Sequence, residues 1–481
     1  MSKPAAARLP RRQGAKIYLA GSIVGQACAL LRYTLLARLL GPEQLGLVAI
    51  LILVSNFFEL LSDTGSDRFL IQDSQGDRTE VQNLVQLVFF GRGAFMALGL
   101  ALCAMPIALM YHQPSLFAGL ALLGLSPLIA GLTHLDMRRY QRHNDFRVEG
   151  LATLVSEVLS LAATLTAAFI THSFTAILYG LIVRSLVVVA ISHLRAERPY
   201  RLEYTRDVAR RLALFSGPLI ANGVLLFMAG QSDRLMVSSL VGLTALGHYS
   251  AVLLLVLYPT AALTKYVAGI HLPLVAANPN STAPEAAPEL LAGRSLLLSV
   301  GIATGFAIFG PIAVWVLYGA KFVQAPFLIA MIGVLQTGRF IRVWPTTLAI
   351  GLGRSHIVMA NNAARMVGIP AAFAGLALWG GIAGVVSGFL VGEFAALVTA
   401  VVMLNRARGL AWTYDFDRIA AFAVASGLIL AGLASFQARW TPGLVVSAPL
   451  FLATLAWLAV RERASIENGS RMIQRLVRRV A

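Results

Sequence analysis

The chain has 481 residues, of which 58% are hydrophobic and 13% are charged, and its formal net charge at pH 7 is +17. Soluble domains carry about 25% charged and 45–50% apolar residues, so this composition excludes an ordinary soluble protein and indicates a polytopic membrane protein. The positive charge is typical of cytoplasmic loops in such proteins and requires no nucleic-acid partner. Cys28 and Cys103 both lie inside apolar runs, so we expect neither a disulfide nor a metal site.

The apolar runs predict an all-α protein with about fourteen transmembrane helices, because roughly 20 helical residues cross a bilayer. The expected helices span residues 15–40, 45–61, 81–111, 115–135, 148–171, 174–194, 212–241, 245–270, 290–318, 325–351, 356–379, 380–404, 419–436 and 444–460. We expect the second helix to end near residue 61 or to continue to residue 71. We assign residues 1–200 and 201–410 to two six-helix lobes, residues 411–462 to two extra helices, and residues 463–481 to a basic amphipathic cytoplasmic tail.

Two short stretches about two hundred residues apart match each other. Residues 39–46 read LLGPEQLG and residues 240–247 read LVGLTALG, and each joins one long apolar run to the next. A second pair, PIAL at 106–109 and PIAV at 311–314, falls near the ends of corresponding helices. The matches predict two pseudo-symmetric lobes of the same orientation, related by an axis along the membrane normal.

Basic residues gather in alternate loops. The loop after residue 135 and the segment 195–211 are arginine-rich, whereas the opposite turns carry few cations beyond Lys321 and Arg439. By the positive-inside rule, this asymmetry places both termini in the cytoplasm. We therefore expect a multi-pass membrane protein.

The hairpin at 39–46, the helix exit LSDTGSDRFLIQ at 61–72 and the repeat GLTALGHY at 242–249 resemble the Wzx-type polysaccharide flippases. These belong to a superfamily that also holds the multidrug and toxin extruders and the lipid II flippases. The resemblance covers the chain from the first to the twelfth expected helix. It implies two six-helix bundles that open a central cavity alternately inward and outward. It also implies a cargo of undecaprenyl-pyrophosphate-linked oligosaccharide repeat units and a location in the bacterial inner membrane. Because the sequence has neither a set of catalytic residues in its outer turns nor a glycine-rich phosphate loop, we expect no enzymatic activity and no cofactor.

Charged residues inside the bilayer cost about 2.5–3.5 kcal/mol on insertion scales, and those that persist usually face a cavity, pair or serve transport. Here the excess is cationic, and the arginine fork suits phosphate oxygens. We expect substrate binding by Arg32, Arg92, Arg234, Arg339, Gln231 and Gln336. The alternative is that each arginine belongs to a structural ion pair or extends its side chain to the interface.

Two further groups have mixed interpretations. Asp63, Arg68 and Lys265 are candidates for a cytoplasmic gate, although Asp63 and Arg68 also suit a solvated helix exit. Asp233, Glu157 and Glu393 are candidates for binding a coupling proton or Na⁺; for the two glutamates the alternative is pairing with Arg184 or Arg365.

Four glycines recur at a spacing of four residues, at positions 380, 384, 388 and 392. Residues four apart lie on the same face of a helix, so these glycines form one row along it. The row predicts close approach of a neighbouring helix.

Other function classes stay open. A lipid II flippase and a multidrug antiporter share the expected fold, but a drug antiporter would favour carboxylates facing a cationic cargo. A polysaccharide polymerase or ligase is disfavoured, because every expected outer turn is only a few residues long. We expect a monomer with lipid-linked oligosaccharide and membrane lipids as partners, and a polysaccharide polymerase in the same pathway.

Overall fold

The computed structural model describes residues 11–143, 145–277, 288–463 and 465–467. In this described part of the chain the secondary structure is helical throughout, without strands. The chain forms two compact units: residues 1–231 with 242–247, and residues 232–241 with 248–481. The lobe boundaries expected from the sequence stay a prediction, and most of the expected tail, 463–481, lies outside the described residues.

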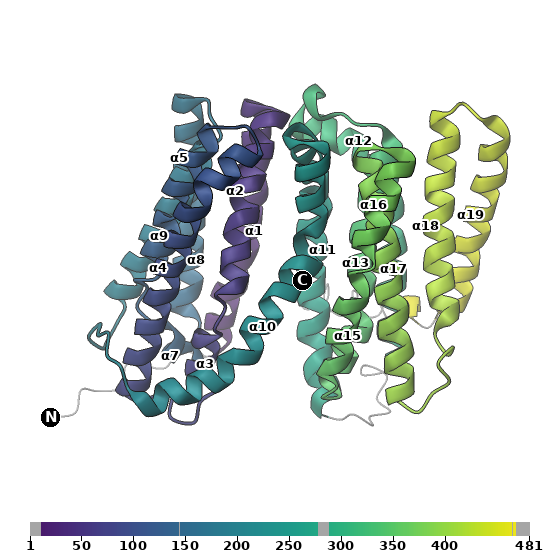
Figure 1. The fold of residues 1–481 in the computed structure, drawn as a ribbon. Helices are drawn as coiled ribbons and strands as arrows, with labels where there is room; N and C mark the ends of the chain where they lie inside the picture. The colour runs from purple at the N-terminus through teal and green to yellow at the C-terminus, as the bar shows by residue number, and fades with distance from the viewer. Residues whose placement is uncertain (1–10, 144, 278–287, 464, 468–481) are drawn as a thin grey trace. The chain divides into compact units, whose positions relative to one another are not determined.

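The first unit contains nine helices and most of a tenth among its described residues (Figure 1). They are α1 (Arg11–Leu40), α2 (Pro42–Leu61), α3 (Ser66–Gln72), α4 (Thr79–Met110), α5 (Ser115–Leu123), α6 (Leu125–Ala130), α7 (Asp136–Arg142), α8 (Arg147–Thr171), α9 (Ala176–Leu194) and α10 (Arg206–Met236). Helix α8 packs along both α1 and α9. Its packing stripe is made of small residues four apart: Ala152, Ser156, Ser160, Thr164 and Ala168 are all buried.

The second unit begins with the last residues of α10, where a π-helical turn (Val237–Val241) precedes α11 (Leu243–Ala277). The remaining helices are α12 (Pro288–Tyr318), α13 (Pro326–Ile341), α14 (Val343–Gly351), α15 (Ser355–Arg365), α16 (Gly368–Trp379), α17 (Gly381–Ala407), α18 (Phe416–Gln437) and α19 (Thr441–Arg461), with a short 3₁₀ helix at Ala320–Phe322. An apolar core of this unit surrounds Trp344, which is 2% exposed.

Twelve of the described helical segments are long and apolar enough to cross a membrane. The other two expected crossings are not among these twelve. Residues 115–135 divide into α5 and α6, and residues 356–379 divide between α15 and α16. The count of fourteen crossings therefore stays a prediction.

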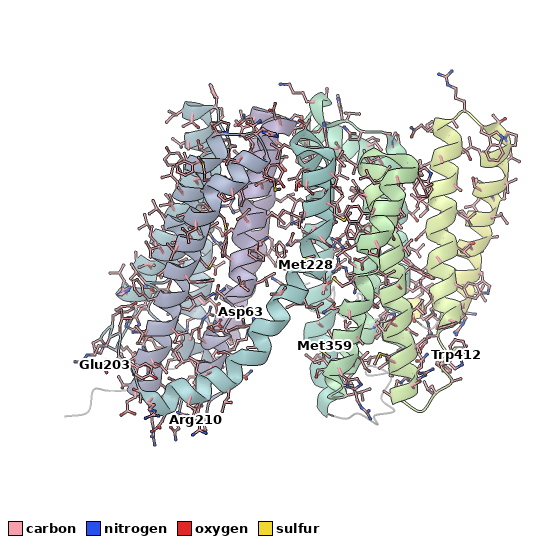
Figure 2. The ribbon with its side chains drawn as sticks, in the orientation of Figure 1. Asp63, Glu203, Arg210, Met228, Met359 and Trp412 are labelled. Atoms are coloured by element: carbon pink, nitrogen blue, oxygen red, sulfur yellow. The ribbon has the colours of Figure 1, made fainter. Side chains whose placement is uncertain are left out.

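The second expected helix ends at Leu61 and does not continue to residue 71. A short non-helical connection follows, and α3 begins at Ser66 after Gly65 adopts a left-handed conformation with φ 60°. Figure 2 shows Asp63 at this junction, and it shows Glu203 and Arg210 at the end of the first unit where α3 and α7 lie. Phe69, Leu84 and Leu212 pack together there and join α3, α4 and the start of α10 in a small apolar core.

The two matching stretches, 39–46 and 240–247, are both helix junctions. Gly41 and Gly242 have φ of 83° and 119°, a region that side chains with a Cβ rarely adopt, so glycine permits each sharp reversal. The junctions also contact each other. A Cβ on Gly46 would overlap the carbonyl oxygen of Leu243, and one on Gly247 would overlap that of Pro42. Matching glycines thus allow these two junctions to pack reciprocally within the first unit, backbone against backbone.

The predicted glycine row is confirmed in part. A Cβ on Gly388 would overlap the amide nitrogen of Ala372, and Gly384 and Gly392 face α15 and α16 backbone similarly closely. Gly380, by contrast, is the turn residue between α16 and α17, with φ 68°, and no described atom lies within 4 Å of the position that a Cβ would take there. The close packing of α16 on α17 therefore rests on three of the four glycines.

Candidate functional site

Each unit contains a buried network of arginines and carboxylates within its membrane-spanning helices. In the first unit, Arg32 of α1 donates from Nη2 to Glu157 Oε2 of α8 at 3.0 Å and from Nη1 to the Ser160 hydroxyl. Arg184 of α9 forms a 2.7 Å ion pair with Glu157 Oε1. Two arginines therefore share one carboxylate, and one positive charge is in excess.

Close helix packing brings these three charges together. A Cβ on Gly21 of α1 would lie 2.8 Å from the carbonyl oxygen of Gly150 on α8, and one on Gly180 of α9 would overlap the Thr164 hydroxyl of α8. Because α8 is flanked by glycines on both neighbours, its Glu157 reaches both α1 and α9. The side chains of Arg32 and Glu157 are 8% and 7% exposed, so burial strengthens their attraction relative to water.

The network of the second unit is larger. Arg339 of α13 donates from Nη2 to Asp233 Oδ2 of α10 at 2.8 Å and from Nε to Glu393 Oε1 of α17 at 3.0 Å. Glu393 also pairs with Arg342 at 2.7 Å and with Arg365 of α15 at 2.5 Å. In these ion pairs three arginines face two carboxylates, an excess of one positive charge, and the neighbouring Arg234 adds a further positive charge near Asp233.

Neutral groups complete this network. The Tyr249 hydroxyl of α11 donates to Asp233 Oδ2 at 2.5 Å, and Arg342 Nη1 donates to Asn361 Oδ1 at 2.9 Å. Gln336 donates from Nε2 to the Thr260 hydroxyl at 3.0 Å. Together these contacts tie α10, α11, α13, α15 and α17 to one another through side chains.

The predicted substrate-binding residues fall into different settings. Arg32 and Arg339 are paired with carboxylates, as in the alternative interpretation, and Gln336 is buried against α11. Arg92 lines a cavity in the first unit. Gln231 and Arg234 are half-buried residues of α10. The structure therefore does not bring the four predicted arginines into one described set of contacts, and their role in binding an anion stays a prediction.

The ion-pair partners proposed for the two glutamates are confirmed: Glu157 pairs with Arg184, and Glu393 pairs with Arg365. Asp233, the third candidate for ion coupling, is 1% exposed and holds both Arg339 and Tyr249. Coupling by these acids stays a prediction.

Among the gate candidates, Asp63 and Arg68 form a 3.2 Å ion pair, and the Arg68 side chain is 55% exposed. Asp63 Oδ1 also accepts from the backbone N–H of Gly65 at 3.0 Å. Lys265 is exposed on α11. The gate function stays a prediction.

Sequence reasoning did not identify Ser160, Tyr249 or Asn361 as network members. Each is a common polar residue in an apolar helix and joins the network only through a partner on another helix. Such partners can be far away in the sequence, since Arg32 and Ser160 are 128 residues apart. Tyr249 does close the repeated stretch 242–249, which was the available signal.

Residues 35–326 match a sequence family described as "Polysaccharide biosynthesis protein". A curated relative, the succinoglycan biosynthesis transport protein ExoT of Rhizobium meliloti (strain 1021), is 28% identical over 245 residues. That match covers 50% of this chain and 48% of the relative, so the chain matches about half of the relative's length.

Solved structures show the same fold. The lipid II flippase MurJ in an inward closed conformation has a TM-score of 0.69 at 12% identity, with 93% of this chain and 99% of that chain covered. An inward-facing multidrug resistance MATE family transporter of the MOP superfamily has a TM-score of 0.62 at 12% identity, with 83% and 95% covered. A mutant form of the Vibrio cholerae MATE transporter VcmN has a TM-score of 0.58 at 16% identity, with 84% and 98% covered. These neighbours are described as transporters and flippases, and none as an enzyme.

Proposed function

Because this chain belongs to the polysaccharide biosynthesis protein family, we propose that it is a flippase that moves a lipid-linked oligosaccharide across the bacterial inner membrane. The fold shared with flippases and multidrug transporters supports a transport role. The curated relative, which is described as a transport protein of succinoglycan biosynthesis, supports a carbohydrate cargo.

The observation that carries the cargo assignment is the cationic excess of both networks within the membrane-spanning helices. In the first unit Arg32 and Arg184 exceed Glu157 by one charge, and in the ion pairs of the second unit three arginines exceed two carboxylates by one, with Arg234 as a further cation nearby. A positive charge held within membrane-spanning helices favours an anionic cargo, since the attraction is less screened there than in water. The pyrophosphate of an undecaprenyl-pyrophosphate-linked oligosaccharide has that charge.

The networks also suit alternating access. Each one joins helices of a single unit, α1, α8 and α9 in the first and α10, α11, α13, α15 and α17 in the second. Side-chain ion pairs between packed helices resist their separation. Each unit would then move as a body, and rocking of two such bodies around a fixed cargo site is a general transport mode.

The test is a flipping assay on the full-length protein in proteoliposomes, with fluorescent undecaprenyl-pyrophosphate-linked oligosaccharide as cargo. We expect cargo to become accessible in the opposite leaflet at a rate above that of protein-free liposomes. Arg339→Gln should slow flipping strongly, whereas Arg463→Gln, which alters an exposed pair with Glu467, should not. Flipping at the protein-free rate by the intact protein would refute the proposal.

A lipid II flippase is the second candidate, because the MurJ fold covers 93% of this chain. The same liposomes loaded with lipid II separate the two cargoes. Faster flipping of lipid II than of the oligosaccharide substrate would select this alternative. Faster flipping of a cationic drug than of either lipid would instead select a multidrug antiporter.

A further inference from the structure

A cavity of about 390 Å³ lies within the first unit, between α2, α4, α6 and α9. Its volume falls near the lower end of the range of ligand pockets, about 300–1,000 Å³. That is too small for a whole lipid-linked oligosaccharide but sufficient for one or two sugar rings. Its polar wall residues include Ser55, Asn56, Glu59, Arg92, Ser126 and Arg184.

Arg92 supplies a cation without a carboxylate partner among the described residues. Its Nε donates to the Ser62 hydroxyl at 3.1 Å, and its Nη2 donates to the backbone carbonyl of Glu59 at 3.1 Å. Both acceptors are neutral, so they hold the guanidinium in place without forming an ion pair. Gly93 follows immediately, and its close approach to the carbonyl of Pro127 fixes α4 against α6.

Arg184 of α9 also lines the cavity. Its Nε pairs with the buried Glu157, yet its side chain is 48% exposed. The guanidinium is therefore anchored at one edge and accessible at the other. Next to it, Ser185 and Ser126 lie within hydrogen-bond distance, with their hydroxyl oxygens 3.0 Å apart.

The wall combines the groups that a sugar needs. Hydroxyl, amide and carboxylate groups can each pair with ring hydroxyls, while the side chains of Phe89 and Met96 provide apolar surface. The two guanidiniums and the single carboxylate of Glu59 leave one positive charge in excess at the wall. Arg184 also contacts Glu157, which in turn pairs with Arg32, and including these two residues leaves the excess at one positive charge.

We propose that this cavity is a subsite for a sugar residue bearing one acidic substituent, such as a uronic acid of the cargo. Arg92 binds the carboxylate, and Glu59 and Asn56 accept and donate hydrogen bonds to ring hydroxyls. The inference rests on the proposed flippase function, because it concerns the glycan of that cargo. It adds that the first unit discriminates acidic from neutral glycans independently of the pyrophosphate.

Occupancy of the subsite is also connected to α1. The chain of contacts runs from Arg184 to Glu157 and from Glu157 to Arg32. An anion at the cavity competes with Glu157 for Arg184 and so alters the contacts that hold α8 against α1.

The test uses the full-length protein in nanodiscs, with Cys28 and Cys103 replaced by alanine and a reporter cysteine introduced by Ser55→Cys in the cavity wall. The labelling rate by a small maleimide is measured with a lipid-free glucuronic-acid disaccharide, a neutral disaccharide of the same size, or inorganic pyrophosphate. We expect the acidic disaccharide alone to slow labelling in a saturable way. Arg92→Gln should weaken its apparent affinity by at least about tenfold, since hydrogen bonds to charged groups contribute at this level. Arg92→Lys should retain part of the preference, and Arg463→Gln should retain all of it.

Three results would overturn the subsite. Equal protection by neutral and acidic disaccharides would exclude acidic recognition, and equal protection by pyrophosphate would assign the cavity to the lipid pyrophosphate. Absence of protection by any sugar, in a preparation that still flips lipid-linked oligosaccharide, would reject the subsite and leave the flippase function intact. Protection by the acidic disaccharide in a preparation that flips no cargo would instead reject the flippase function and retain the subsite.

Discussion

Glu393 binds three guanidinium groups at once, from Arg339, Arg342 and Arg365. An ionised carboxylate has about four lone-pair sites, so one side chain can satisfy several donors. The same charge keeps three cations close together inside an apolar bundle. Without it, Arg339 would keep Asp233 as a carboxylate partner, but the mutual repulsion of the three cations and the desolvation of Arg342 and Arg365 would be much less compensated.

Glu393→Gln is therefore expected to destabilise the protein by about 3–5 kcal/mol, the usual cost of breaking a buried pair by removing one partner. Thermal unfolding of the purified protein in detergent measures this loss. Glu467→Gln, at an exposed pair with Arg463, should cost less than about 1 kcal/mol. Adding Arg365→Gln to Glu393→Gln should recover part of the stability, and a further loss would contradict the charge-balance account.

His134 lies outside the membrane-spanning helices and takes part in a second group of hydrogen bonds. Its Nε2–H donates to the Arg198 carbonyl at 2.9 Å, and its Nδ1 accepts the Asp136 N–H at 3.1 Å. Burial lowers the pKa of His134, and the ring is also near Arg139 and His193. Burial alone would raise the pKa of Asp136, but hydrogen bonds from Arg139 and from the backbone of Glu197 and Arg198 hold it below its usual value.

The pH dependence follows from these directions. As pH falls, His134 is protonated near pH 6.5 in the unfolded protein but only at a lower pH in the folded protein. The contribution of neutral His134 to the free energy of unfolding is therefore complete above about pH 6.5 and is lost as pH falls from there through the lower pKa of the folded state. The stabilisation provided by ionised Asp136 is lost only at still lower pH, where its carboxylate is protonated. Hydrogen exchange of the Asp136 amide should accelerate as pH falls below about 6.5, after correction for intrinsic exchange. His134→Gln should remove this dependence, and His143→Gln, at an exposed histidine beside Asp77, should retain it.

At the scale of elements, glycine decides how closely helices approach. On α17, a Cβ added to Gly388 would meet the backbone of Ala372 on α16, whereas on α18 no described atom lies within 4 Å of a Cβ at Gly427. The two glycines therefore form a matched pair, one packed and one open.

Gly388→Ala should lower the stability by about 1–3 kcal/mol, because it forces two packed backbones apart. Gly427→Ala should be neutral or stabilising by up to about 1 kcal/mol, since alanine is the better helix former. Thermal unfolding of both variants under identical detergent conditions is the measurement. Equal losses at both positions would show that α16 and α17 do not pack closely.

The reciprocal contact of the repeats gives another prediction at this scale. Gly46→Ala and Gly247→Ala each push the same two junctions apart, since each glycine faces the partner junction's backbone. Each variant should slow flipping in the proteoliposome assay. When the rates are converted to activation free energies, the change in the double variant should be smaller than the sum of the changes in the two single variants. Gly269→Ala, on the same α11 but with no described atom within 4 Å of its Cβ, is the control. Strict additivity would show that the contacts are independent.

For the whole molecule, the distribution of arginine predicts orientation. We expect the turn at 112–114 to face outside and the connection at 73–78 to face the cytoplasm, following the positive-inside rule. In a variant lacking Cys28 and Cys103, a membrane-impermeant maleimide should label Gln113→Cys in intact cells. It should label Ser74→Cys only after the membrane is opened. The reverse pattern would invert the predicted topology.

The sequence alone determined the features that depend on local pattern. Hydropathy is a sum over neighbouring residues, so the membrane class and most helix positions could be predicted from it. The partners of Glu157 and Glu393 could be predicted as well, because the expected helices contain only a few charged residues with which they could pair. The glycine spacing of α17 similarly predicted a close helix contact, because residues four apart share a helix face.

Only the tertiary structure decided the breaks in residues 115–135 and 356–379, the burial of Arg32 and Arg339, and the cavity beside Arg92. These depend on residues far apart in the chain: Arg339 and Asp233 are separated by 106 positions, and Arg32 and Glu157 by 125. Whether an intramembrane arginine meets a carboxylate or a cavity is set by which helices pack beside it. Charge and spacing along one helix contain no such information.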